Sequence, residues 1–542
     1  MEDENESHTH AEVVDVDADE GRVRAGSQSD APLAPKPRSA FGVVGVACIA
    51  AFQFGYSTAV MSGALAPVLA SFWPCPSSSS SSSSFSDSTL GSTSASGEHC
   101  TEASSLMQGL LVSVILAGAL VGALGGGPLA DAVGRLAALA ADEALYAAGA
   151  LLCALARGPA VFVVGRVVLG LGVGVGSTVP SMYAAEVAPL HQRGQVGVFN
   201  QLMICVGIFA AYTVCALLGL LRDAELAWRL MVGAPVAVAA LHGLLLLAVP
   251  ACRVESPRWL AHRRRHAQAR AALQRLRGHT FSDAEFQELL TAVGNGSDGA
   301  TGGDGDDNND DDGNKQEQQK QEQNQKQQSA LYEAFHPARP IIIATGLMFW
   351  QQITGINAVL YYLSTFFVTA GMSAELAGYM SMVVGAVNIA MTFVSVPLIE
   401  RVGRKPLLLA SLGGMTATLA AIGLLGLFAG TGSAAGIGSV VVTALFVVSF
   451  AVGMGCCPWA VINELFSHRA RGIAVSLAMA TNWVTNLFVT LVFPIVTEAV
   501  NMGYAFIGFA VFGVCAFIFV AALLPETKGR TVEDIVSQFR KH

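Results

Sequence analysis

Apolar and polar positions alternate along this chain in long blocks. Runs of about 20 apolar residues recur from residue 41 to residue 524, and about 20 residues is the length a helix needs to cross a bilayer. The pattern therefore predicts an all-α membrane protein with twelve transmembrane helices. We expect them at residues 41–70, 106–128, 136–156, 160–183, 197–221, 228–250, 340–369, 376–399, 406–429, 437–461, 472–497 and 503–524.

Polar segments divide these spans into larger units. The acidic segment 1–39 lacks the apolar core of a cleavable signal peptide, so we expect the first span to serve as its own insertion signal. Segment 294–330 is rich in Gly, Asp, Asn, Gln and Lys, a composition that cannot bury a core. The expected units are a disordered cytosolic tail (1–39), an N-terminal six-helix bundle (40–250) with a serine-rich outward loop (73–105), a basic, helical cytosolic segment (251–293), a disordered linker (294–330), a C-terminal six-helix bundle (331–524) and a cytosolic tail (525–542).

The distribution of Lys and Arg predicts which side each end lies on. If the N-terminus is cytosolic, the outward loops hold only Arg157, Arg222 and Arg229, and nearly all of the other basic residues fall in cytosolic segments. This is the bias expected of multi-pass membrane proteins. Because the number of spans is even, both termini are expected in the cytosol.

Composition narrows the possible functions. The chain is 53% hydrophobic and 13% charged, whereas soluble domains carry about 25% charged residues. The net charge of -9 comes largely from the tail and the linker, and no basic footprint for nucleic acid is visible. We find no motif for a nucleophile, a metal or a phosphate, and we therefore expect no enzyme activity, no cofactor and no metal.

A charged pattern repeats in the two halves of the chain. "DAVGR" ends at Arg135 and "ERVGR" ends at Arg404, and in each half a later Glu is followed seven residues on by Arg-Gly. Ordinary loop charges would explain the arginines but not acids that recur in register. The repeat therefore predicts two homologous six-helix bundles, the architecture of major facilitator transporters.

Several motifs make the likeness more specific. They are "GRVVLGLGVGVGSTVPSMYAAEVAPLHQRG", "VESPRWLA", "QQITGINAVLYY", "ERVGRK", "PWAVINELFSHRARG", "TNWVTN" and "PETKGRT". With these motifs the chain resembles the sugar porter family of the major facilitator superfamily, and within it the GLUT-type hexose facilitators. The resemblance covers residues 41 to 531. It implies a carrier that moves a hexose across a membrane by alternating access.

The motif "QQITGINAVLYY" supplies the chemistry that binding a sugar needs. A hexose presents many hydroxyls, and amides offer both donors and acceptors without a charge. Gln351 and Asn357 are six residues apart and would diverge on an unbroken helix, so we expect Gly355 to break it. The alternative to sugar binding, for any single one of these amides, is a hydrogen bond between two helices. By resemblance, the site is lined by Gln201, Ile204, Ile208, Gln351, Gln352, Asn357, Asn388, Trp459, Asn482 and Trp483.

Two departures from the family pattern leave the choice among hexoses open. Many glucose facilitators carry a Glu at the position of Ala451. Glucose-selective members have Gln-Leu-Ser where this chain has Met348-Phe349-Trp350.

The repeated charges are expected to form a cytosolic latch between the two bundles. The resemblance implies that they pair when the carrier is open outward and separate when it opens inward. The alternative is exposed ion pairs worth at most about 1 kcal/mol each. Leu136 replaces a basic residue that the family usually carries, which is expected to weaken the contribution of the first half. The latch residues are Asp131, Arg135, Glu186, Arg193, Glu400, Arg404, Glu464 and Arg471.

Ser57 bears on the energy source of transport. Proton-coupled sugar porters carry an Asp at this position, modulated by an Arg that corresponds to Arg166. A serine does not ionise near neutral pH, so we interpret Ser57 as the mark of a uniporter, with Arg166 in need of other partners. The alternatives are a proton symporter that uses Asp142 or Glu143, and a non-transporting sugar sensor. We expect those two acids to be solvated near the cytosolic face or paired with a cation.

Three expectations concern the surroundings of the carrier. Cys75 and Cys100 share the outward loop, where oxidation is permitted, and a disulfide between them is an open possibility. The partners expected are a monosaccharide and the lipid bilayer, with no nucleic acid. The membrane expected is the plasma membrane.

Overall fold

The structure, a computed structural model, is helical throughout its regular elements in the part of the chain that it describes. The described residues are 40–73, 98–189, 193–248, 253–294, 332, 335–428, 433–466, 470–528, 530, 535 and 539.

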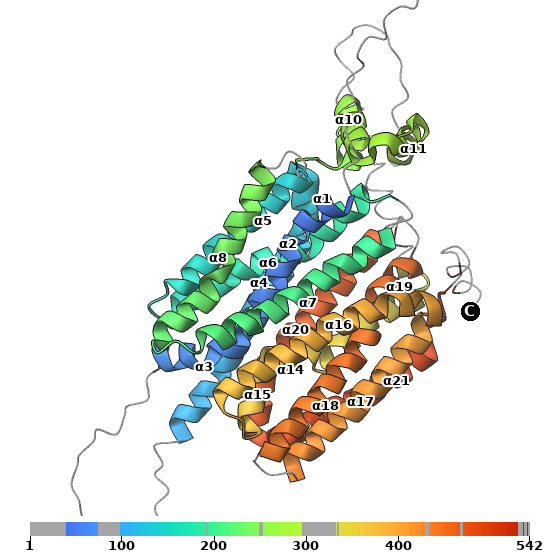
Figure 1. Cartoon of the computed structure of the whole chain (residues 1–542). Helices are drawn as coiled ribbons and strands as arrows, with labels where there is room; N and C mark the ends of the chain where they lie inside the picture. The colour runs from blue at the N-terminus through green and yellow to red at the C-terminus, as the bar shows by residue number, and fades with distance from the viewer. Residues whose placement is uncertain are drawn as a thin grey trace, which may run out of the picture.

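The N-terminal half crosses the membrane region six times. Its first crossing is divided into three consecutive helices, and the other five crossings are single helices (Figure 1). The helices are α1 (Ala40–Ala47), α2 (Ile49–Ala59), α3 (Met61–Phe72), α4 (Glu98–Val133), α5 (Arg135–Ala154), α6 (Pro159–Val187), α7 (Arg193–Leu218) and α8 (Ala224–Ala248).

Short helices follow the sixth crossing and project beyond one end of the bundle, as Figure 1 shows for α10 and α11. We call this the α10 end. "ESPRWLAHRRRHAQARAALQRLRG" was expected to be helical, and it is. The elements are α9 (Pro257–His262), α10 (His266–Arg277), the 3-10 helix η2 (Gly278–Thr280) and α11 (Asp283–Gly294).

The C-terminal half repeats the six crossings. Its first crossing is again divided into three helices, and its fourth is divided into two. The helices are α13 (Ala338–Ile353), α14 (Ile356–Tyr361), α15 (Leu363–Thr369), α16 (Ala374–Val402), α17 (Arg404–Phe428), α18 (Ser433–Val452), α19 (Cys457–Leu465), α20 (Arg471–Val500) and α21 (Met502–Leu523).

The helices pack closely within and between the halves. In the first half α6 packs against α4 and α5, and in the second α17 packs against α18 and α21. Small residues permit this closeness. A methyl group at Gly118 on α4 would lie 2.3 Å from the backbone oxygen of Val167 on α6. The two halves meet mainly where α4 contacts α20 and where α7 contacts α16.

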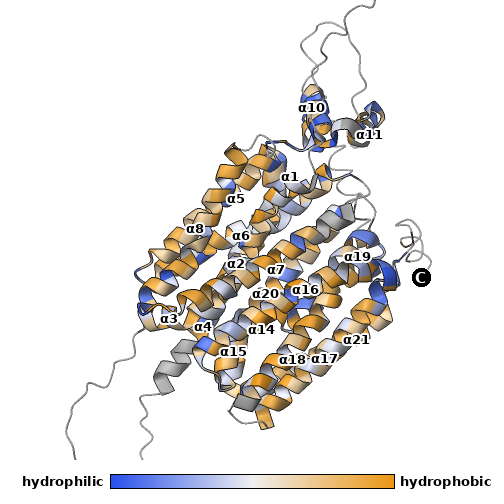
Figure 2. Cartoon of the chain, in the orientation of Figure 1, coloured by the Kyte–Doolittle hydropathy of each residue, from blue (hydrophilic) through white to orange (hydrophobic). Residues whose placement is uncertain are grey.

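The outer surface of the helices suits a lipid environment. Large apolar side chains such as Leu244, Phe428 and Ile518 are well exposed, and Figure 2 shows hydrophobic colour along the helices with hydrophilic colour toward their ends. Eleven helical stretches in the described residues are long and apolar enough to cross a membrane. The seventh predicted span is divided among α13, α14 and α15. The prediction of two six-helix bundles is confirmed.

Candidate functional site

The seventh crossing breaks where the sequence predicts. Gly355 adopts the left-handed conformation, with φ of 84°, between α13 and α14. Its N–H donates to the Gln352 carbonyl at 3.0 Å, which closes the end of α13. A Cβ at this position would lie 2.7 Å from ring atoms of Phe509. Only glycine tolerates both the conformation and the close ring.

The break brings amides from two helices together. Asn482 Nδ2 on α20 donates to Gln351 Oε1 at 3.0 Å, and Gln351 Nε2 donates to the Met454 carbonyl at 2.6 Å. Asn357 Nδ2 donates to Gln352 Oε1 at 2.7 Å. Asn357 therefore meets Gln352, while Gln351 is held by α20. Four buried or half-buried amides therefore form two hydrogen-bonded pairs in the interior of the second half, Gln351 with Asn482 and Gln352 with Asn357.

Aromatic side chains lie beside these amides. Trp483 is next to Asn482 on α20, and its ring centroid lies 5.6 Å from that of Phe54 on α2. This contact joins the two halves of the molecule. The indole Nε1 of Trp483 is buried and has no hydrogen-bond partner among the described residues, so it is a donor available to a ligand. Trp459 on α19 is half-buried.

The remaining predicted site residues lie on α7 and α16, where the halves also meet. Gln201 on α7 contacts Cys205 one turn later, at 3.7 Å from Nε2 to Sγ. The Cys205 thiol lies 3.5 Å from the Thr392 hydroxyl on α16, and that hydroxyl donates to the Asn388 carbonyl at 2.8 Å. Asn388 is buried. Ile204 is half-buried and Ile208 is buried on α7.

At the two departures from the glucose pattern, Ala451 and Met348 are buried, Trp350 is half-buried and Phe349 is exposed. Trp350 packs on Phe349, with centroids 5.1 Å apart, and on Phe519 of α21, at 6.1 Å. This tryptophan is thus engaged with α21.

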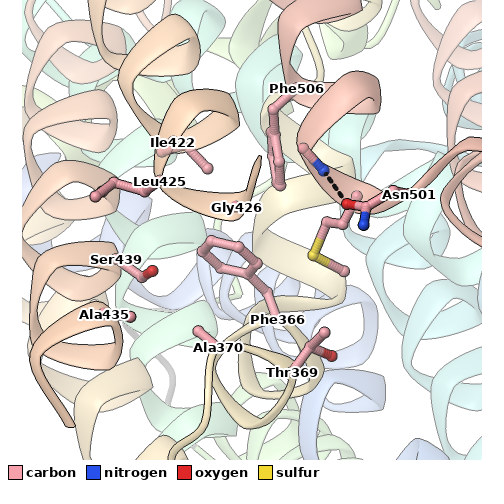
Figure 3. A pocket seen from close by; sticks show the side chains of 12 residues that line it. Phe366, Thr369, Ala370, Ile422, Leu425, Gly426, Ala435, Ser439, Asn501 and Phe506 are labelled. Carbon is pink, nitrogen blue, oxygen red and sulfur yellow. Dashed lines mark hydrogen bonds between the residues drawn. The ribbon is translucent and has the colours of Figure 1, made fainter. Parts of the chain in front are cut away.

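A pocket elsewhere in the second half is separate from the amides. Figure 3 shows it between α15, α17, α18 and α21. Its walls are mostly apolar, and the side chain of Asn501 is occupied in accepting from the Gly503 N–H at 2.9 Å. A pocket with so few free polar groups does not fit a hexose. It is lined by Phe366, Thr369, Ala370, Ile422, Leu425, Gly426, Ala435, Ser439, Asn501, Met502, Gly503 and Phe506.

Ser57 and Arg166 lie together in the interior of the first half. Both are almost fully buried. Arg166 donates to the carbonyl of Ser57 at 2.8 Å and to the carbonyls of Leu111 and Val112 at 3.3 and 3.4 Å. The Ser57 hydroxyl has no partner among the described residues. Backbone dipoles of α2 and α4 therefore supply the partners that the sequence left open for Arg166.

The latch charges of the first half pair within that half. Arg135 donates twice to Glu186 at 2.8 Å, and its Nη2 lies 3.0 Å from Asp131. Arg135 is buried, so this pair is more than an exposed ion pair. The side chain of Arg193 lies outside the described residues.

The second half repeats this arrangement. Arg404 donates to Glu464 at 2.7 Å, which matches the pair of Arg135 with Glu186. Arg471 donates to the Phe466 carbonyl at 3.3 Å, and Glu400 is exposed. The sequence led us to expect pairs across the junction of the halves, whereas these ion pairs each join helices of one half.

Each charged cluster contains one further glutamate that was not among the predicted residues, Glu255 in the first half and Glu526 in the second. Glu255 accepts from the N–H groups of Arg135 and Leu136 at 3.0 and 3.2 Å, at the start of α5. Glu526 accepts from those of Arg404 and Lys405 at 3.0 and 3.1 Å, at the start of α17. Carboxylates are stabilising at helix N-termini. The signal was present, since both lie in quoted motifs, "VESPRWLA" and "PETKGRT".

The charge of Glu526 is stabilised where it lies. Partial burial acts to raise the pKa of its carboxyl, but four backbone N–H groups, from Lys528, Arg404, Lys405 and Thr527, together hold that pKa below its usual range. A lowered pKa stabilises the fold above the ordinary pKa of glutamate, and this stability is lost as the pH falls through the lowered value.

Of the two alternatives expected for Asp142 and Glu143, solvation is wrong, while Glu143 has His242 as a neighbour that can carry a positive charge. Both acids are buried inside the first half. Glu143 Oε1 lies 2.5 Å from His242 Nδ1 on α8, and its Oε2 accepts from Gln53 Nε2 at 2.5 Å. Asp142 has no hydrogen-bond partner among the described residues. Both acids lie about two turns into α5, which packs against α2, α6 and α8. At this depth the inner face of α5 is covered by protein and not by solvent.

The predicted disulfide is not tested by this structure. Cys75 and the side chain of Cys100 lie outside the described residues. The pairing stays a prediction.

Comparison with known proteins identifies the class. The family model described as "Sugar (and other) transporter" matches residues 43–539. The chain therefore belongs to this family of transporters, and it is a multi-pass membrane protein with the major facilitator fold.

Individual relatives agree with that assignment. The chain is 34% identical over 437 residues to the putative metabolite transport protein YwtG of Bacillus subtilis, covering 80% of this chain and 87% of that protein. It is 33% identical over 525 residues to plastidic glucose transporter 4 of Arabidopsis thaliana, covering 95% and 84%.

Solved structures of the xylose transporter XylE from E. coli share the fold. The inward-open conformation matches with a TM-score of 0.71 and 25% identity, covering 92% of this chain and 99% of XylE. The structure of the proton:xylose symporter XylE bound to 6-bromo-6-deoxy-D-glucose matches with a TM-score of 0.69 and 26% identity, with the same coverage.

Proposed function

We propose that this transporter carries a hexose by alternating access and works as a uniporter. The observation that carries the hexose assignment is the two amide pairs on α13, α14 and α20, beside the indole of Trp483, whose Nε1 has no partner among the described residues. Neutral amides with an aromatic neighbour suit the hydroxyls and the apolar faces of a monosaccharide. Glucose transporters among the relatives support a hexose.

The surroundings of Ser57 support uniport. The position that carries an Asp in proton-coupled members of the family holds a buried hydroxyl, and Arg166 is satisfied by three carbonyls. The relatives also include a proton symporter, the D-xylose-proton symporter of E. coli, so symport is the alternative mode. We assign uniport to this chain on the chemistry of Ser57. The Lys and Arg distribution supports a cytosolic position for the α10 end and both termini.

The test is accumulation in vesicles. The purified protein, reconstituted in liposomes, should bring a non-metabolised hexose to equal concentrations on the two sides, with or without an imposed proton gradient. A proton-coupled carrier would instead gain about 2.3 kcal/mol for each charge moved across 100 mV, or roughly fiftyfold accumulation. Concentrative uptake that a protonophore abolishes would contradict uniport, and an absence of hexose flux would contradict the substrate.

A further inference from the structure

A cluster of ionisable side chains lies in the first half, away from the amides. Gln53, Asp142 and His242 have no exposed surface, and Glu143 has 4%. They come from three helices, α2, α5 and α8. Buried ionisable groups at membrane depth are costly, and they are found where a protein binds ions or protons.

The cluster has an unequal set of donors and acceptors. Glu143 is fully engaged, with Gln53 on one oxygen and His242 on the other. Both carboxyl oxygens of Asp142 and the Nε2 atom of His242 are buried without a hydrogen-bond partner among the described residues. A carboxylate without a donor is poorly stabilised in an apolar interior, so a negative charge on Asp142 would be costly.

In the part of the chain that the structure describes, no arginine or lysine pairs with Asp142 or Glu143. Arg166 is committed to carbonyls on α2 and α4, and Arg135 to Glu186 and Asp131. Helix α4 carries no titratable side chain from residue 106 to residue 130. Around Asp142 and Glu143 the structure places His242 of α8, the neutral amide of Gln53 on α2 and the backbone of Gly176 on α6. Tyr146 of α5 is also near, and its hydroxyl donates to the Ala50 carbonyl.

One proton decides the charge of this cluster. A proton shared between His242 Nδ1 and Glu143 Oε1 gives either an imidazolium–carboxylate pair or a neutral acid beside neutral imidazole. Both have zero net charge. Loss of that proton to water leaves one uncompensated negative charge in the interior, which also alters the acceptor that Gln53 binds.

The cluster is connected to the sugar site through α2. Gln53 binds Glu143, and the next residue, Phe54, packs on Trp483 of the other half at 5.6 Å between ring centroids. We propose that Asp142, Glu143, His242 and Gln53 form a proton-binding site that controls the rate at which the two halves rearrange around the sugar. The inference rests on the transport function proposed above, and it concerns the rate and not the driving force.

The test is the pH profile of equilibrium exchange, with equal pH on both sides of reconstituted liposomes. Between about pH 5.5 and pH 8.5, the rate of labelled-hexose exchange should change about threefold or more. His242→Gln and Glu143→Gln should flatten this profile. His266→Gln, which removes an exposed histidine of α10, is the matched control and should leave it unchanged.

The outcomes separate this proposal from the transport proposal. A flat profile in the unaltered protein overturns the proton site and needs no variant that folds. An unchanged profile in both His242→Gln and Glu143→Gln overturns it as well. Absence of exchange at every pH contradicts hexose transport instead, and a pH-dependent rate with equal final concentrations supports both proposals.

Discussion

At the scale of the residue, the amides of the second half have two roles. Gln351 binds Asn482 and the Met454 carbonyl, so it is an interhelical contact. The same groups are the donors and acceptors that a hexose needs. If these amides form the proposed hexose site, a bound sugar would exchange these contacts for hydrogen bonds with its own hydroxyls.

Replacing Gln351 by Ala tests this role. The variant should raise the half-saturation concentration for hexose about tenfold, the loss of one or two hydrogen bonds at about 1 kcal/mol each. Concentration-dependent uptake measures the effect. Gln268→Ala, on the exposed face of α10, is the control and should behave as the unaltered protein. Normal kinetics in well-expressed Gln351→Ala protein would remove Gln351 from the site.

At the scale of the element, interruptions of helices position the chemistry. Gly355 ends α13 and starts α14, which lets Asn357 reach Gln352 across the break. Glu255 and Glu526 each cap the N-terminus of a helix, α5 and α17, that begins about 120 residues earlier in the chain. Breaks and caps of this kind depend on one residue, so single substitutions should expose them.

Gly355→Ala should damage the seventh crossing. The left-handed conformation costs an alanine about 1–2 kcal/mol, and its methyl group would also collide with Phe509. We expect a lower melting temperature in detergent and a loss of hexose uptake. Gly413→Ala on α17 is the matched control, because a methyl group there meets nothing within 4 Å. Equal melting temperatures for the two variants would show that the break tolerates a side chain.

At the scale of the whole molecule, hydroxyl contacts join the halves at the end opposite α10. Ser62 on α3 lies 3.1 Å from Ser364 on α15, and the Ser364 hydroxyl lies 3.1 Å from that of Ser381 on α16. The Tyr212 hydroxyl of α7 donates to the Leu360 carbonyl at 2.7 Å. Figure 1 shows α3 and α15 together at this end. These neutral contacts are weak enough to separate during rocking of the halves.

A disulfide across this contact should stop transport. In the Ser62→Cys, Ser364→Cys double variant, the two sulfur atoms would come within bonding range, and oxidation would fix the halves together. Hexose exchange should fall on oxidation and return on reduction. Each single variant serves as a control, and exchange that persists after complete cross-linking would show that this end does not open in the transport cycle.

Local features of the sequence determined the helices, the two halves and the break at Gly355. Long apolar runs and a glycine in an amide-rich stretch carry that information by themselves. The partners of the buried groups were decided by the tertiary structure. Glu143 meets His242 across 99 residues, and Gln351 meets Asn482 across 131. Lipid and core are equally apolar, so hydropathy does not tell which apolar residues of a membrane helix face inward. The packing of α5 on α6 and α8 decides that Asp142 and Glu143 lie inside the first half and meet groups from other helices.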